Sequence, residues 1–356
     1  MIYRITTQGH NGTEIETLRY ATHGHYDDDG NYYEPRLTNP GNYSRSMFRS
    51  GTTRGESSVG VGEIVVDNLD GALDRIKGWG FSGRSVLIEK LEAEGATPTL
   101  VWKGAVEQPV VGLKEVQFRV RDRLEDLRKA LQQNRFAGTT IAGGMAECEG
   151  RPDDLKDQPK PLPFGSVFNV PASPGNVYDL IYQVRDGAVA GIPFVFDKGV
   201  QLTNANQDYA TLAALRAATI PAGKYATCLA MGCFRLGGSP AGQITADVIV
   251  GSTTAERSVG SIVRQILTRA GIAAEDQPDL SGLPDYEVGL WIADETTALS
   301  AITQIIGSVG GYFISTRTGG FAVGVFRAPA TPTFELDTAD ILDITAKVPS
   351  EDGKGV

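Results

Sequence analysis

The chain has 356 residues and carries 33 basic and 43 acidic side chains, a formal net charge of −10. No stretch approaches the roughly 18 apolar residues of a membrane span, and the N-terminus lacks the apolar core of a secretory signal, so we expect a soluble chain made in the cytoplasm. The acidic excess lies almost wholly after residue 135, and it excludes a surface built to grip nucleic acid, which needs clustered lysine and arginine. A chain of this length predicts two or three domains.

Residues 21–35, ATHGHYDDDGNYYEP, contain two of the three histidines and three consecutive aspartates. His23 and His25 could share a metal ion, because side chains two apart on a strand point to the same face. The DGN at 29–31 is instead typical of a tight hairpin turn, and the flanking tyrosines and threonines are typical of paired strands. No third ligand with similar spacing follows, so we predict a hairpin without a metal.

The rest of the first third shows short apolar or alternating runs over residues 59–68, 85–93, 99–108 and 114–120. Segments rich in Gly, Asp and Ser separate these runs, which predicts a series of strands in a barrel or sandwich. The period then changes to that of a helix, which we expect to close a first domain over residues 1–135. Its apolar face is formed by Leu124, Leu127 and Leu131.

Residues 136–163 show no sustained period, and we expect a connecting segment there. Strand-like runs resume over 164–250, with one short helical piece near 209–218, and predict a β-rich middle domain. Residues 251–356 predict an α+β domain with two helices and a final hairpin joined by TGG. The expected fold class is therefore mainly β with an α+β C-terminal part, in several domains with tube-like barrels or sandwiches and two or three amphipathic helices.

The first of these two helices opens on a capping box, Thr253 with Glu256, and ends at Gly271. The second ends at Gly310. Each places its large apolar residues on one face, which predicts burial of Ile262, Val263, Ile266 and Leu267 in the first and of Ala298, Leu299, Ile302, Ile305 and Ile306 in the second.

The sequence offers no convincing catalytic group. Cys148 has no nucleophile motif around it, and Cys228 and Cys233 lie in an apolar stretch that is typical of buried small side chains. The glycine-rich loop at 51–62 lacks the Lys-Ser/Thr of a phosphate-binding loop, and no G-x-S-x-G or H-E-x-x-H occurs.

The most patterned carboxylates, Asp67, Asp70 and Asp74, surround the turn sequence NLDG, which favours a structural role. We therefore expect no catalytic, cofactor-binding or metal-binding residue, and no enzyme activity.

Four segments resemble, in the same order, the tail-tip or baseplate hub proteins of tailed phages and gene transfer agents. The first, residues 57–89, has a Gly-Glu strand, an Asn-x-Asp-Gly-x-Leu-Asp turn and a Gly-Arg before the next strand. The others are KPLPFGSVFNVPA at 160–172, the run at 234–251 and the run at 295–326.

The resemblance implies a non-enzymatic virion protein at the tail tip, a homotrimer whose ring continues the lumen of the tail tube. A distal tail or tube protein would lie above it, with a central spike or fibre and the tape-measure protein below, and DNA would pass through without specific binding. Because tail tubes are built on sixfold rings, the resemblance also implies two tube-like β-domains in each chain, one over residues 1–135 and one from about residue 164 onward.

Two other functions stay open. One is a tail-associated carbohydrate- or receptor-binding module, in which Tyr26, Tyr32 and Tyr33 would stack on sugar rings. The other is hydrolysis of cell-wall glycan by a pair of carboxylates, for which the sequence contains no motif.

Overall fold

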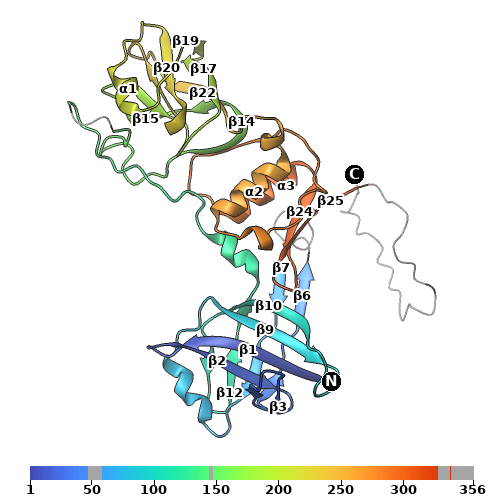
Figure 1. Cartoon of the computed structure of the whole chain (residues 1–356). Helices are drawn as coiled ribbons and strands as arrows, with labels where there is room; N and C mark the ends of the chain where they lie inside the picture. Colours follow the sequence, from blue (N-terminus) through green and yellow to red (C-terminus); the bar gives the residue numbers. More distant parts are fainter. Residues whose placement is uncertain (47–57, 144–146, 328–336, 338–356) are drawn as a thin grey trace, which may run out of the picture. The chain divides into compact units, whose positions relative to one another are not determined.

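The computed structural model describes residues 1–46, 58–143, 147–327 and 337 (Figure 1). Residues 326–356 form a separate unit, and the features below all belong to residues 1–325. Most of the glycine-rich loop expected at 51–62 lies outside the described residues. The chain is mainly β with a few helices, as predicted.

Residues 2–121, here called the first β module, form two antiparallel sheets that share one hydrophobic core. Both sheets are open at their edges, so of the two expected forms the module has that of a sandwich and not a closed barrel. The first sheet has the spatial order β13 (Val120–Arg121), β10 (Thr99–Val106), β9 (Arg84–Leu91), β1 (Ile2–His10) and β2 (Ile15–Ala21). The second sheet has the order β11 (Val110–Val111), β12 (Glu115–Phe118), β8 (Ile64–Asp67) and β5 (Leu37–Asn39).

Period-2 alternation gives the first β module its core. Ile5 on β1 lies opposite Tyr20 on β2 and Ile88 on β9, and all three side chains are buried. A 3₁₀ helix, η1 (Ala72–Gly78), and the residues after it add aromatic rings beneath β1. A Cβ at Gly9 would lie 2.7 Å from Phe81, so β1 passes over this ring only with glycine there.

Two small hairpins complete this region. They pair β3 (His25–Tyr26) with β4 (Tyr32–Tyr33) and β6 (Tyr43–Ser46) with β7 (Ser58–Val61). The strand expected over 59–68 is thus divided, because the chain turns away at Gly62, where a Cβ would lie 2.6 Å from the backbone nitrogen of Asn42.

Residues 162–250, here called the middle β module, again form two sheets, one of which also includes β23 from the following region of the chain. A short helix, α1 (Leu212–Ala217), connects β19 and β20, which are the only parallel strand pair in the described residues 162–250. The first sheet has the spatial order β18 (Val200–Gln201), β17 (Gly191–Asp197), β22 (Ile244–Ile249), β14 (Leu162–Pro171) and β23 (Gly289–Ile292). The second sheet has the order β15 (Ser173–Asn176), β16 (Ile181–Gln183), β21 (Cys233–Leu236), β20 (Lys224–Cys228) and β19 (Thr203–Asp208).

The α+β region, residues 251–325, is built on α2 (Val259–Arg269) and α3 (Ala298–Ser308), which lie against each other in Figure 1. All nine apolar residues predicted to be buried in these helices are buried. The hairpin of β24 (Gly311–Ser315) and β25 (Phe321–Val325) is also as predicted. Short 3₁₀ helices η3 (Leu229–Met231), η4 (Ala255–Arg257) and η5 (Ala274–Asp276) lie between the main elements.

The start of α2 differs from the prediction. One bond of the expected capping box forms, since the Glu256 amide donates to Thr253 Oγ1 at 3.3 Å. The Glu256 carboxylate accepts from the Ser252 amide at 2.6 Å and not from the amide of Thr253. These bonds lie at the start of the short helix η4 and not at the start of α2, which begins at Val259 with Ser258 as its N-cap. The helix ends as expected at Gly271, whose φ of 84° only glycine adopts easily.

The helix expected to close the first domain is also different. It is a short 3₁₀ helix, η2 (Arg123–Arg128), and Leu131 lies beyond its end. The side chains of Leu124, Leu127 and Leu131 are buried as predicted, but they pack in the core formed by α2 and α3. The Leu131 amide also donates to the Thr296 carbonyl at 2.8 Å. Spacing identified the apolar face correctly and could not tell which core would receive it.

Strand β14 belongs to two cores. Its first half, Leu162–Gly165, pairs with β23 and packs with α2, whereas its second half pairs with β22 inside the middle β module. Gly165 lies opposite Gly289 at the change of partner and has a φ of 66°. A Cβ at Gly165 would lie 1.9 Å from the Val288 carbonyl oxygen, and one at Gly289 would lie 1.9 Å from the Ser166 carbonyl oxygen. The junction therefore requires glycine at both positions.

Within the described part of residues 136–161 there is no named helix or strand. The segment is nevertheless ordered against its surroundings, since Phe136 is buried and the Gly150 amide donates to the Gly175 carbonyl at 2.7 Å. No helix in the described ranges is long and apolar enough to cross a membrane. The domain boundaries at 135, 163 and 250 stay predictions.

Candidate functional site

The histidine-rich segment forms the predicted hairpin. The Asp27 amide donates to the Asn31 carbonyl, the Gly30 amide donates to the Asp27 carbonyl, and Gly30 has a φ of 78°. The two histidines do not converge: His23 lies outside the strands and is exposed, whereas His25 is buried and stacks on Tyr33 with ring centroids 5.2 Å apart. Among the described residues no group of three or more His, Cys, Asp or Glu side chains is placed to hold a metal ion.

The three tyrosines near this hairpin have different environments. Tyr26 and Tyr32 are 67% and 46% exposed, and their ring centroids lie 5.0 Å apart with the planes tilted by 46°. Tyr33 is buried, its hydroxyl lies 2.9 Å from Thr6 Oγ1, and the Arg4 guanidinium lies over its ring. Only two of the three candidate sugar-stacking tyrosines are therefore accessible.

The carboxylates near the NLDG turn have structural partners. Asp70 forms two hydrogen bonds with Arg36, at 2.8 and 2.6 Å, and this guanidinium holds the pKa of the Asp70 carboxyl well below its usual range. Asp74 accepts from the Asn68 side-chain amide at 3.1 Å, and Asp67 accepts from the Leu69 amide at 3.0 Å. This geometry fixes the turn and leaves no matched acid and base pair there.

The cysteines meet in the middle β module. Cys228 and Cys233 are opposite each other on β20 and β21, and Cys148 Sγ lies 3.8 Å from Cys233 Sγ. All three are buried and reduced, and they pack with apolar neighbours such as Ile181 and Leu215. The pKa of the Cys233 thiol is raised well above its usual value by the hydrogen bond to Cys148 and by burial, which suppresses the nucleophilic thiolate.

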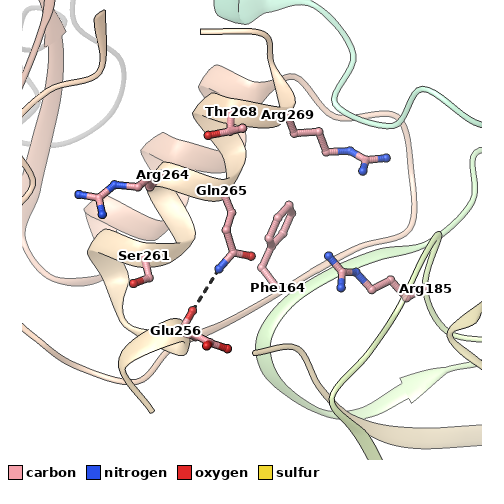
Figure 2. A pocket seen from close by; sticks show the side chains of 8 residues that line it. All are labelled: Phe164, Arg185, Glu256, Ser261, Arg264, Gln265, Thr268 and Arg269. Atoms are coloured by element: carbon pink, nitrogen blue, oxygen red, sulfur yellow. Dashed lines mark hydrogen bonds between the residues drawn. The ribbon is translucent and has the colours of Figure 1, made fainter. Parts of the chain in front are cut away.

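A cavity of about 600 Å³ lies against the polar side of α2. Ser261, Arg264, Gln265 and Thr268 follow helical spacing and lie opposite the buried apolar face. Figure 2 shows the Phe164 ring and the Arg185 side chain facing this stripe. At one end, the Gln265 side-chain amide donates to the Glu256 carbonyl at 3.1 Å. The cavity therefore joins α2 to residues of the middle β module.

Two arginines of this cavity differ in how their charge is balanced. Arg269 donates from Nε to the Leu131 carbonyl at 3.0 Å and forms an ion pair with Asp186 at 3.0 Å. Arg185 donates to the Ala188 carbonyl through one terminal nitrogen, but its buried Nε has no hydrogen-bond partner. Burial, and then repulsion by Arg269, lowers the pKa of Arg185 below its usual value.

The cavity thus gathers three arginines and one glutamate among its lining residues. Residues 261, 264, 265 and 268 form a polar stripe at helical spacing in the sequence, but such a stripe has the same pattern as the ordinary solvent-facing side of a helix. Arg185 comes from the turn after β16, and no periodicity in the sequence connects it with α2.

No family model matches the chain, and no curated protein matches it. Among solved structures, a chain from "Virion of native gene transfer agent (GTA) particle" aligns over 70% of this chain and 79% of that one, with 12% sequence identity and a TM-score of 0.23. A TM-score of this size carries no conclusion about a common fold or function.

Proposed function

We propose that this chain is a non-enzymatic structural protein of a phage-like virion, a hub at the tail tip or baseplate. Its subunits would form a trimeric ring that continues the tail-tube lumen. The proposal rests on the order of the four sequence segments that resemble hub proteins, together with one structural observation.

That observation is the presence of two β modules in one chain, each with two sheets and its own core. A trimer that contacts a sixfold tube must present six similar elements, and one chain supplies two of them only if it carries two comparable modules. The first β module lies within the range expected for the first element, and the middle β module begins close to the start expected for the second.

Open sheet edges and exposed apolar side chains suit assembly into a ring. One sheet of the middle β module exposes Phe168 on β14, Phe194 on β17 and Val200 on β18, with exposed fractions of 72%, 44% and 69%. Apolar side chains on a sheet surface favour contact with another protein. In the proposed hub they would contact the neighbouring subunit, in a heterologous interface repeated around the ring.

The remaining partners follow from this placement. A distal tail or tube protein would bind above the ring, and a central spike or fibre with the tape-measure protein below it. DNA would pass through the lumen without specific binding, in keeping with the acidic net charge. The protein would be made in the host cytoplasm and function in the virion.

Electron microscopy of the assembled particle, with mass measurement of the purified chain, tests the proposal. We expect three copies around an axial opening, with both β modules contributing to its wall. A monomer that decorates the outside of a tail, or six copies that each line the opening with one module, would contradict it.

The accessible tyrosines support a second candidate, a carbohydrate- or receptor-binding module. Tyr32 also lines an open cavity of about 580 Å³ with Arg36 and Asp70, so a ring surface lies beside polar groups able to bond hydroxyls. Binding of the purified chain to a glycan array, lost in Tyr26→Ala and Tyr32→Ala, would favour this function over the hub.

A further inference from the structure

We infer that the cavity beside α2 is a binding site for a single carboxylate, held by Arg185. The inference does not require the hub function, because it concerns the chemistry of the cavity alone. It begins with the Arg185 guanidinium, whose buried Nε has no partner although Arg185 lines an accessible cavity. Because this Nε has almost no accessible surface, a ligand in the cavity would bind through the terminal nitrogens of Arg185, one of which already donates to the Ala188 carbonyl.

The surrounding charges show that the missing acceptor is an anion. No ion pair joins Arg185 to a carboxylate in the described part of the chain, because Asp186 is engaged by Arg269. Repulsion by Arg269 outweighs the attraction between Arg185 and Asp186. Guanidinium groups form strong charge-assisted hydrogen bonds with carboxylates, so a carboxylate in the cavity would balance the charge of Arg185.

The net charge favours a monoanion over a dianion. Arg185, Arg264 and Arg269 supply three positive charges, and Asp186 and Glu256 supply two negative ones, so the group has a net charge of +1. One carboxylate would neutralise this group. A phosphate dianion would leave a negative excess beside Glu256.

The cavity also has room for more than the carboxylate group. Its volume of about 600 Å³ and the Phe164 ring on its wall accommodate the apolar part of the molecule that carries the anion. Gln265 and Ser261 provide polar groups at its α2 side. The ligand can be an acidic side chain of a protein or a small organic acid, and both present the same chemistry.

NMR spectroscopy of the full chain can observe the arginine Nε–H groups directly. The variant Arg185→Lys keeps the positive charge, loses the Nε–H group and identifies the Arg185 signal by its absence. We propose titration with N-acetyl-glutamate methylamide, which carries one carboxylate, against sodium chloride and inorganic phosphate at equal ionic strength. The Gln265 side-chain amide signal reports binding in both proteins.

We expect a saturable shift of the Arg185 signal with the carboxylate, none with chloride, and weaker binding of phosphate. In Arg185→Lys, the affinity measured at Gln265 should fall at least about tenfold. Arg75→Lys is the control, since Arg75 lies on η1 in the first β module and does not line the cavity, so the affinity of this variant should be unchanged. No saturable shift, an equal response to chloride, tighter binding of phosphate, or unchanged affinity in Arg185→Lys would overturn the inference.

A second titration distinguishes the two sources of the carboxylate. The probe is a synthetic peptide with the sequence of residues 333–344, TFELDTADILDI, which has four acidic residues and no basic one. Tighter binding than the small acid supports a protein segment as the ligand, and equal or weaker binding supports a small organic acid. Both results support the carboxylate site, provided that Arg185→Lys weakens the binding.

Discussion

The two β modules have the same number of sheets but differ in how they are connected to the rest of the chain. In the first β module, every strand of both sheets comes from residues 2–121. The middle β module includes β23, which comes from the α+β region and pairs with the first half of β14. The first module is therefore complete in itself as a set of sheets, whereas the middle module shares a strand with a second core.

The difference determines how a local change should spread. The first module contacts the final hairpin through a few bonds, such as that from the Lys103 amide to the Arg317 carbonyl at 2.9 Å. At β14, Phe164 packs with α2 while Val167 packs inside the middle module, only three residues away. A substitution that destabilises the α2 core should therefore also destabilise the middle module. A substitution that destabilises the first module should leave the other parts of the chain unchanged.

The largest effect is expected for Ile266→Ala in α2. Ile266 is fully buried, and its truncation should lower the free energy of unfolding by about 2–5 kcal/mol because a cavity remains. Thermal or denaturant unfolding measures this, with Arg264→Ala on the exposed face as control, expected within about 0.5 kcal/mol. Equal melting temperatures for the two variants would show that this face is not packed.

Gly289→Ala tests the shared strand and should cost about 1–3 kcal/mol or more, because its Cβ would meet the Ser166 carbonyl and the backbone must move. Gly191→Ala is the control, since Gly191 starts β17 in the same sheet and has open space around it. Hydrogen exchange should show loss of protection on both sides of β14. If protection were lost only in α2 and α3, β14 would not couple the middle module to the α2 core.

Asn68→Ala tests whether the first module is independent. The buried Asn68 amide donates to Asp74 and Gly112, and its oxygen accepts from the Leu73 amide at 2.8 Å, so removal should cost about 1–3 kcal/mol. The exposed Thr13→Ala should change little. Combined with Ile266→Ala, the loss should be additive within about 0.5 kcal/mol if the two cores are independent, and strong non-additivity would refute that view.

The smallest effect is expected for Glu287→Gln at the junction. Glu287 accepts from Ser166 and Arg257 at 2.7 Å each, and these bonds lower the pKa of its carboxyl. Its contribution to stability is therefore present above the usual glutamate pKa and is lost as the pH falls through the lower, folded-state pKa. A melting-temperature difference at neutral pH that disappears in acid is expected, with exposed Glu14→Gln as control. A difference that grows in acid would have the wrong sign.

The sequence by itself determined most of the local structure. The turn after Tyr26, the buried faces of α2 and α3, the helix ends at Gly271 and Gly310 and the final hairpin were predicted and are present, because turn chemistry and hydrophobic period are local properties. The capping box expected at Thr253 shows the limit of this reasoning, since only the bond from the Glu256 amide to Thr253 forms, and it lies at a short 3₁₀ helix and not at the start of α2.

Only the tertiary structure decided which elements share a core and which charges meet. The leucines of η2 pack with α2, β14 changes partner at Gly165, and Arg185 lies beside Arg269, which is 84 positions later in the sequence. None of these follows from period or spacing, because burial specifies that a face is covered without specifying by what. The candidate carboxylate site could not be predicted for the same reason, because its charge imbalance depends on the ion pair between Arg269 and Asp186, which forms only in the folded chain.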